Sequence, residues 1–209
     1  MKGGTKMDAK QHWEHIYATK APDRVSWYQA HAQRSLDFIR RTGVDRAEAI
    51  IDVGGGASTL VDDLVTEGFE QVTVLDLSAK ALELARQRLG GRAANVNWIE
   101  ADVTRATLPA EAYAVWHDRA VFHFLTEAGD RQRYVENVRR AVRAGGHVIV
   151  ATFATDGPDH CSGLEVMRYD PESLHEEFGG EFELVESERE AHATPFGTEQ
   201  RFVWCYCRR

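Results

Sequence analysis

The sequence predicts an α/β fold in which helices cover both faces of a doubly wound, mostly parallel sheet. From Ala49 onward, apolar runs typical of buried strands alternate with helical patterns in steps of roughly 20–25 residues. One of these strand-to-helix transitions passes through three consecutive glycines at 54–56. Such alternation indicates a parallel sheet, because each crossover must return the chain to the same end of the sheet.

The individual elements follow from changes in the hydrophobic period along the chain. Short apolar runs predict strands at 49–53, 71–75, 96–100, 113–118 and 145–152. Apolar residues at helical spacing predict helices at 8–20, 31–42, 58–67, 78–89, 129–143 and 171–178. Two closing strands, near 181–188 and 199–207, are expected to form a hairpin. We expect residues 1–48 to form a helical cap or lid that packs with the main domain, 49–209, as one compact unit.

The composition excludes several classes of function. The chain has 209 residues and a formal net charge of −8, which disfavours a nucleic-acid partner. No apolar run reaches the roughly 20 residues that a membrane span needs, and no apolar core of a signal peptide follows the basic start. The three cysteines, an odd number, favour a reducing cytoplasm over a disulfide framework. The composition leaves the oligomeric state open.

The most informative motif covers residues 50–60. A buried strand carrying Asp52 opens into the glycines 54–56, after which helical spacing resumes. Glycine permits a tight turn and removes the Cβ that would block a ligand, and the helix N-terminus behind it offers free N–H groups. Asp76 ends the next predicted strand, where an acid can bind ribose hydroxyls. Thr59 stands where the dinucleotide pattern G-x-G-x-x-G needs its third glycine.

This loop and its spaced acids resemble the class I S-adenosylmethionine (SAM)-dependent methyltransferases. The resemblance covers residues 49–207 and implies a seven-stranded sheet whose last strand is inserted antiparallel. It also implies that Asp52 orients the amino group of SAM and that Asp76 binds the ribose. Leu77 would then lie against the adenine, and Asp102 would bind the adenine amino group. The implied cofactor-binding set is Asp52, Gly54, Gly55, Gly56, Asp76, Leu77, Asp102, Val103 and His117.

The end of the fourth predicted strand, within residues 113–125, is where this class holds the reacting methyl group. Its His-Asp-Arg turn and aromatic-His pair are similar to those of a group of small bacterial class I enzymes. The resemblance implies that Asp118, Arg119 and His123 face the acceptor as the catalytic residues. His123 is the candidate base for an acceptor that carries a proton, since histidine has an unperturbed pKa near ~6.5. Alternatively, Asp118 and Arg119 form a local ion pair and His123 packs in the core.

No metal site is expected. His12 and His15 are spaced i,i+3 on a predicted helix, but no strong third ligand follows. Cys205 and Cys207 share one face of a predicted strand, and with Cys161 they could bind a soft acceptor such as arsenic. Packing as small buried side chains is the favoured interpretation of all three cysteines.

The sequence therefore predicts a cytoplasmic enzyme that transfers a methyl group from SAM to a small-molecule acceptor, without a nucleic-acid or membrane partner. The small size and short loops favour such an acceptor over the runner-up, a protein lysine. An NAD(P)-dependent oxidoreductase and a non-catalytic SAM-fold binding module are further alternatives. The aromatic-rich segment 8–31, which includes Trp27 and Tyr28, is expected to act as a lid over the substrate. The acceptor and its reacting atom (O, N, S or C) stay open.

Overall fold

The structure is a computed structural model that describes residues 8–209; residues 1–7, part of the expected cap, lie outside the described residues. Its strands are β1 (Ala49–Val53), β2 (Gln71–Asp76), β3 (Val96–Glu100), β4 (Tyr113–Arg119), β5 (Val142–Phe153), β6 (His160–Cys161), β7 (Leu164–Glu165), β8 (Glu183–Ala193) and β9 (Glu199–Arg208). Its α-helices are α1 (Ala9–Thr19), α2 (Gln33–Arg41), α3 (Leu60–Thr66), α4 (Ala79–Leu89), α5 (Ala128–Ala141) and α6 (Pro171–Phe178). Three short 3₁₀ helices are η1 (Pro22–Arg24), η2 (Gly90–Asn95) and η3 (Phe122–Phe124).

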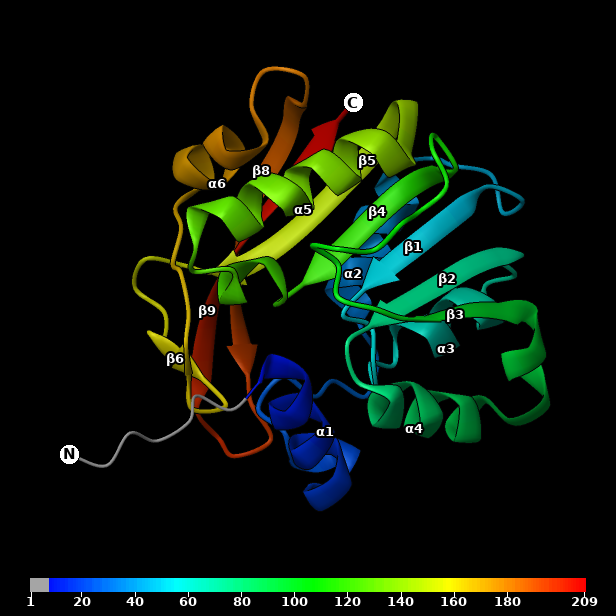
Figure 1. The fold of residues 1–209 in the computed structure, drawn as a ribbon, viewed down its shortest axis with the longest axis vertical. Coiled ribbons are helices and arrows are strands. Elements are labelled where there is room, and N and C mark those ends of the chain that lie inside the picture. Colours follow the sequence, from blue (N-terminus) through cyan, green and yellow to red (C-terminus); the bar gives the residue numbers. More distant parts are fainter. Residues whose placement is uncertain (1–7) are drawn as a thin grey trace.

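Seven of the strands form one sheet in the order β3-β2-β1-β4-β5-β9-β8 (Figure 1). β1 to β5 pair in parallel, whereas β9 runs antiparallel to both of its neighbours, β5 and β8. The expected mostly parallel sheet with an inserted antiparallel last strand is therefore confirmed. The strand order reverses between β1 and β4, and in such sheets ligands bind in the crevice that this reversal opens.

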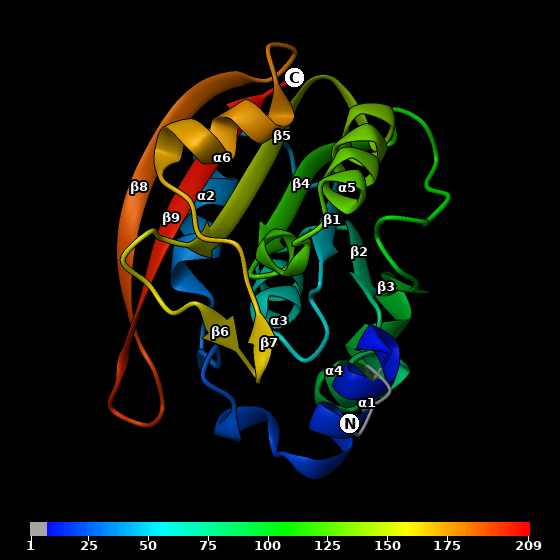
Figure 2. The same ribbon diagram turned by 60° about the vertical axis from the view of Figure 1, so that its left-hand side comes forward.

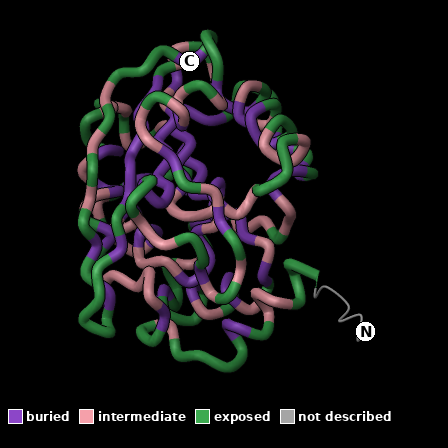
Figure 3. Tube along the Cα trace, turned by 90° about the vertical axis from the view of Figure 1, so that its left-hand side faces the viewer, coloured by how far each residue is buried: buried purple, intermediate pink, exposed green. Residues whose placement is uncertain are grey.

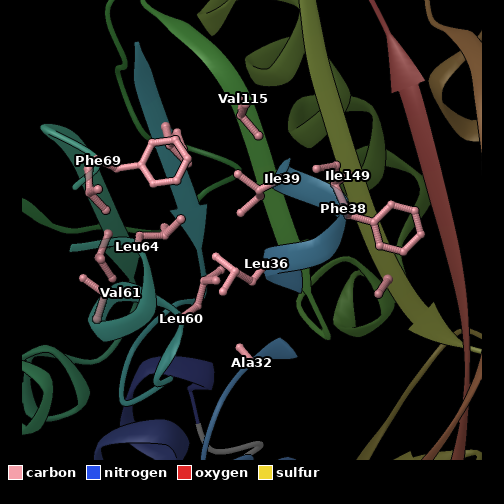
Figure 4. Packing of buried hydrophobic residues seen from close by; sticks show 14 of the residues in the cluster. Ala32, Leu36, Phe38, Ile39, Leu60, Val61, Leu64, Phe69, Val115 and Ile149 are labelled. Atoms are coloured by element: carbon pink, nitrogen blue, oxygen red, sulfur yellow. The ribbon is translucent and has the colours of Figure 1, made fainter. Parts of the chain in front are cut away.

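Helices cover both faces of the sheet, as expected. α2, α3 and α4 pack on one face, and α5 and α6 lie together on the other (Figure 2). Alternate residues of each strand point to opposite faces, so Ile50 and Val115 join the cluster of α2 while Ile51 and Trp116 join that of α5. Figure 4 shows the packing on the α2 face, and Figure 3 shows buried segments inside the trace and exposed segments around it.

Local signals set the ends of several helices. The Ser78 side chain accepts a hydrogen bond from the N–H of Ala81 and so caps α4. Asp170 and Ser173 form a reciprocal capping box at the start of α6, with a proline at the first helical position. Between β5 and α6 lies a short β6–β7 hairpin, in a stretch for which the sequence predicts no strand. Within residues 8–209, no helix is both long and apolar enough to cross a membrane.

α2 is attached to the sheet through an aromatic contact. Phe38 is completely buried, and its ring stacks on that of Trp204 in β9 with a centroid separation of 5.0 Å. This contact connects a helix that precedes the first strand to the strand that ends the chain. It therefore holds one side of the crevice at the carboxyl ends of β1 and β4.

We expect Phe38→Ala to lower the free energy of unfolding by about 3–5 kcal/mol, because it empties a fully packed site. Urea denaturation monitored by circular dichroism measures this loss. Phe196→Ala is the matched control, since Phe196 is 58% exposed and its removal should change stability by less than about 0.5 kcal/mol. Equal effects of the two substitutions would contradict the packing described for α2.

Candidate active site

A hollow opens at the carboxyl ends of β1 and β4, where the strand order reverses. Its enclosed volume is ≈ 50 Å³, or ≈ 590 Å³ counted together with the solvent space at its mouth. The enclosed part is smaller than the roughly 300–1,000 Å³ typical of small-molecule sites, because the cover is closed over it. One wall is the loop after β1, with Gly54, Gly55, Ala57, Ser58 and Thr59. The floor carries Asp52, His117 and Arg119, and the segment 17–35 supplies the cover. Half of the predicted site residues line this hollow: Trp27, Tyr28, Asp52, Gly54, Gly55, His117 and Arg119.

The glycine loop lies directly against two carboxylates. A Cβ on Gly55 would overlap Oδ2 of Asp52, and one on Gly56 would lie 2.5 Å from Oδ2 of Asp76. Gly54 has a φ of +68°, which favours glycine, and a Cβ there would overlap the Val121 side chain. Gly54 is therefore needed for its backbone conformation and for packing, rather than to leave a path for the ligand.

Asp52 and His117 form a buried pair at the floor of the hollow. Oδ1 of Asp52 lies 2.7 Å from Nδ1 of His117, and each residue is only 2% exposed. The second carboxylate oxygen, Oδ2, and the second ring nitrogen, Nε2, are buried and have no hydrogen-bond partner among the described residues. An unsatisfied buried carboxylate oxygen is costly, so this position fits a ligand that donates hydrogen bonds, such as an ammonium group.

Asp76 ends β2 on the other side of the glycine loop. Its Oδ1 accepts a hydrogen bond from the backbone N–H of Ser78 at 2.8 Å. Burial, helped by the charges of Asp52 and Glu14, raises its pKa to about 7, against the lowering by the N–H groups of Ser78 and Leu77. A carboxylate held this far from water is suited to accepting hydrogen bonds from ribose hydroxyls.

The predicted adenine-binding residues lie at the ends of β2 and β3. Leu77 is half-buried and follows Asp76 directly. Asp102 is half-buried, and its Oδ1 accepts hydrogen bonds from both the backbone N–H and the hydroxyl of Thr104. Val103 is 6% exposed and packs into the cluster on the α5 face. One carboxylate oxygen of Asp102 is thus used by its own turn, and the other faces Arg105 at 3.8 Å.

An aromatic cluster covers the hollow. Trp13 and Tyr17 of α1 meet Trp27, with ring centroids 5.8 and 6.4 Å from that of Trp27. Trp27 and Tyr28 also line the hollow itself. Glu14 was not singled out from the sequence, yet its Oε1 accepts a hydrogen bond from the N–H of Ala79 at 2.7 Å, at the start of α4. This bond places α1 beside α4 at the end of the sheet to which β1 and β2 point (Figure 1).

Asp118 does not lie where we expected. Its side chain is fully buried and accepts hydrogen bonds from the N–H groups of Val121 and Phe122 and from the hydroxyl of Tyr134. Burial raises its pKa to about 6. Because neighbouring residues of a strand point to opposite faces, Asp118 points away from the face that carries His117. It holds the turn after β4 rather than facing an acceptor.

His123 is also part of the packed interior. It is fully buried between the rings of Phe124 and Phe153, and its Nδ1 accepts a hydrogen bond from the Phe153 N–H at 3.3 Å. Burial, helped by the charge of Arg119, lowers its pKa to about 3. An accepting Nδ1 leaves the single proton of the neutral ring on Nε2, so neither nitrogen can take a proton from an acceptor. The structure therefore argues against the general-base role that we expected for His123.

The cysteines do not form a trio. Cys205 and Cys207 are 3.4 Å apart at their sulfurs and pack on the α5 face, whereas Cys161 belongs to the cluster on the α2 face. Across residues 8–209 there is no group of three His, Cys, Asp or Glu side chains that could hold a metal ion, and the His12–His15 pair gains no third ligand. Packing in the core accounts for all three thiols.

Comparison with known proteins agrees with this geometry. Residues 50–146 match a protein family described as a methyltransferase domain. The chain is 21% identical over 159 residues to the eEF1A lysine and N-terminal methyltransferase of Mus musculus, an alignment that covers 73% of this chain and 22% of that protein. It is 30% identical over 117 residues to the ubiquinone biosynthesis O-methyltransferase of Serratia proteamaculans, covering 56% and 47% respectively. The chain thus spans about a fifth of the length of the mouse protein.

A solved structure extends the likeness to nearly the whole chain. The SAM-dependent methyltransferase from Anabaena variabilis aligns with 97% of this chain and 96% of its own, with a TM-score of 0.73 and 17% identity. At that identity the likeness establishes the fold. Residues 50–146 thus match a methyltransferase domain, and the strand order is that of the class I, SAM-dependent methyltransferase fold.

Proposed function

We propose that this protein transfers a methyl group from SAM to a small-molecule acceptor. The observation that carries the proposal is the unsatisfied Oδ2 of Asp52 in a covered hollow beside the glycine loop. Asp52 would hold the amino group of SAM, oriented by His117, and Asp76 would hold the ribose. When bound there, SAM supplies an activated methyl group on a sulfonium.

The contribution of the protein to such a reaction is alignment and exclusion of water. Displacement at a methyl group needs little acid or base catalysis, and good alignment alone can supply several kcal/mol of the barrier reduction. This agrees with a site in which Asp118 and His123 are buried in structural contacts. We therefore omit both residues from the proposed catalytic set and keep Arg119, which lines the hollow.

The cover over the hollow favours a small acceptor. Trp13, Tyr17 and Trp27 pack together above the glycine loop, and the segment 8–31 would act as a lid that opens to admit SAM and acceptor. The runner-up is a protein lysine, which is favoured by the 21% identity to the mouse eEF1A methyltransferase.

We also propose a cytoplasmic location, because all three cysteines are free thiols.

Methyl-labelled SAM can separate these acceptors. The protein is incubated with labelled SAM and either the small-molecule fraction or the protein fraction of a cell extract. We expect label in the small-molecule fraction with wild type and roughly tenfold less with Asp52→Asn when SAM is limiting. Label confined to the protein fraction would support the lysine alternative instead. Absence of label from both fractions, with SAM bound, would point to the non-catalytic binding module.

Asp52→Asn should weaken S-adenosylhomocysteine binding by about 1.5–3 kcal/mol, since a hydrogen bond between the ligand ammonium and a buried carboxylate is lost. Isothermal titration calorimetry measures the change. Asp45→Asn is the matched control, because Asp45 is exposed and precedes β1, whereas the glycine loop follows the other end of that strand. An unchanged affinity in Asp52→Asn would remove Asp52 from the cofactor site.

Asp76→Asn should stabilise the free protein and weaken S-adenosylhomocysteine binding. The folded pKa of Asp76, about 7, lies above its ordinary value of 3.8, so the folded state retains a proton that the unfolded state loses. Stability is therefore lost as pH rises from about 4 to 7, and the variant lacks this loss. At pH 8 we expect it to be more stable than wild type by about 1–4 kcal/mol.

Thermal and urea unfolding at pH 5 and pH 8 test this expectation. The stability advantage of the variant should be larger at pH 8, whereas wild type alone should gain affinity for S-adenosylhomocysteine between pH 6 and pH 8. A difference in stability that is the same at both pH values would show that Asp76 does not titrate in this range.

A further inference from the structure

Arg119 lines the hollow, and one edge of its guanidinium has no hydrogen-bond partner among the described residues. Its Nη1 donates a hydrogen bond to the backbone carbonyl of Trp27 at 3.3 Å. Its Nε and Nη2 are buried and have no partner among the described residues. These two nitrogens form one edge of the planar guanidinium, with parallel N–H bonds that match the two oxygens of a carboxylate.

No acid of the described chain neutralises this guanidinium. Arg119 takes part in none of the ion pairs found among residues 8–209. Glu190 attracts the guanidinium electrostatically without forming an ion pair with it, and one of its carboxylate oxygens accepts a hydrogen bond from Nε1 of Trp204 at 2.7 Å. Burial lowers the pKa of Arg119. A buried cation without a partner costs several kcal/mol, so this position favours an anionic ligand.

The free edge lies on the acceptor side of the hollow. Cζ of Arg119 is 4.5 Å from the centroid of the Phe202 ring. Phe202 belongs to β9, which is separated from β4 by β5, whereas the glycine loop follows β1 on the opposite side of β4 (Figure 1). The guanidinium therefore extends away from Asp52 and Gly54, which would hold the methionine end of the cofactor.

We propose that the methyl acceptor carries a carboxylate, which binds in a bidentate manner to the Nε–Nη2 edge of Arg119. The proposal rests on the function proposed above and specifies its substrate class. Among the residues that line the hollow, Arg119 is the only arginine or lysine. A single cation with a single free edge matches one carboxylate better than a doubly charged phosphate. Trp27 and Tyr28, which also line the hollow, provide apolar surface for the rest of the molecule.

Benzoate and benzamide are suitable probes, because they share a ring and differ in charge. Their binding to protein saturated with S-adenosylhomocysteine is measured by ligand-observed NMR titration. We expect wild type to prefer benzoate by roughly tenfold, and Arg119→Met to lose that preference. The affinity for S-adenosylhomocysteine should stay within about threefold of wild type. Arg119→Lys keeps the charge without the bidentate edge and should show an intermediate preference, and Arg92→Met, on the exposed surface, should behave as wild type.

The results of this experiment distinguish a wrong substrate class from a wrong proposed function. No preference for benzoate in wild type, or no binding of either probe, overturns the proposal. A tenfold loss of S-adenosylhomocysteine affinity in Arg119→Met, with unchanged binding of methylthioadenosine, would assign the guanidinium to the carboxylate of the cofactor and also overturn it. Inorganic phosphate that competes better than benzoate would exclude a carboxylate acceptor. Failure of wild type to bind S-adenosylhomocysteine would refute the proposed function itself. If Arg119→Met does not fold, Arg119→Lys supplies the same comparison.

Discussion

The buried contact between Asp52 and His117 is the interaction on which the site depends. It joins β1 to β4 where the strand order reverses, and the two residues are register partners in the sheet. The pair leaves one carboxylate oxygen and one ring nitrogen unsatisfied at the floor of the hollow. Such groups are costly in a folded protein, so the fold must be stabilised elsewhere, and the stacking of Phe38 on Trp204 is one such contribution.

The neighbouring features follow from this constraint. Two carboxylates, of Asp52 and Asp76, approach the loop so closely that Gly55 and Gly56 have no room for a Cβ. The same crowding removes Asp76 from water and raises its pKa to about 7. Ligand binding and protein stability therefore oppose each other at this edge of the sheet. The carboxylates of Asp76 and Asp52, which are suited to bind a nucleoside and an ammonium group, are the groups whose burial destabilises the free protein.

Much of the fold, and the placing of Asp52, Asp76 and His117 close to the glycine loop, could be predicted from the sequence, because period and glycine spacing are local signals. The catalytic assignments depended on which way side chains point after β4, and there the sequence was insufficient. Asp118 and His123 are polar residues beside Arg119, yet hydrogen bonds to Tyr134 and Phe153 place them in the core. β5 begins at Val142 rather than at 145, because Val142 pairs with Tyr113 of β4 and the backbone of Gly145 and Gly146 bonds to Arg209 at the other end of the chain.

A crystal structure of the complex with S-adenosylhomocysteine would test the central claim most directly. The account predicts that the amino group of the ligand lies within hydrogen-bond distance of Oδ2 of Asp52, with the ribose hydroxyls at Asp76 and the sulfur facing the Arg119 side of the hollow. Electron density for the ligand elsewhere on the molecule, or a ligand amino group without contact to Asp52, would contradict the account.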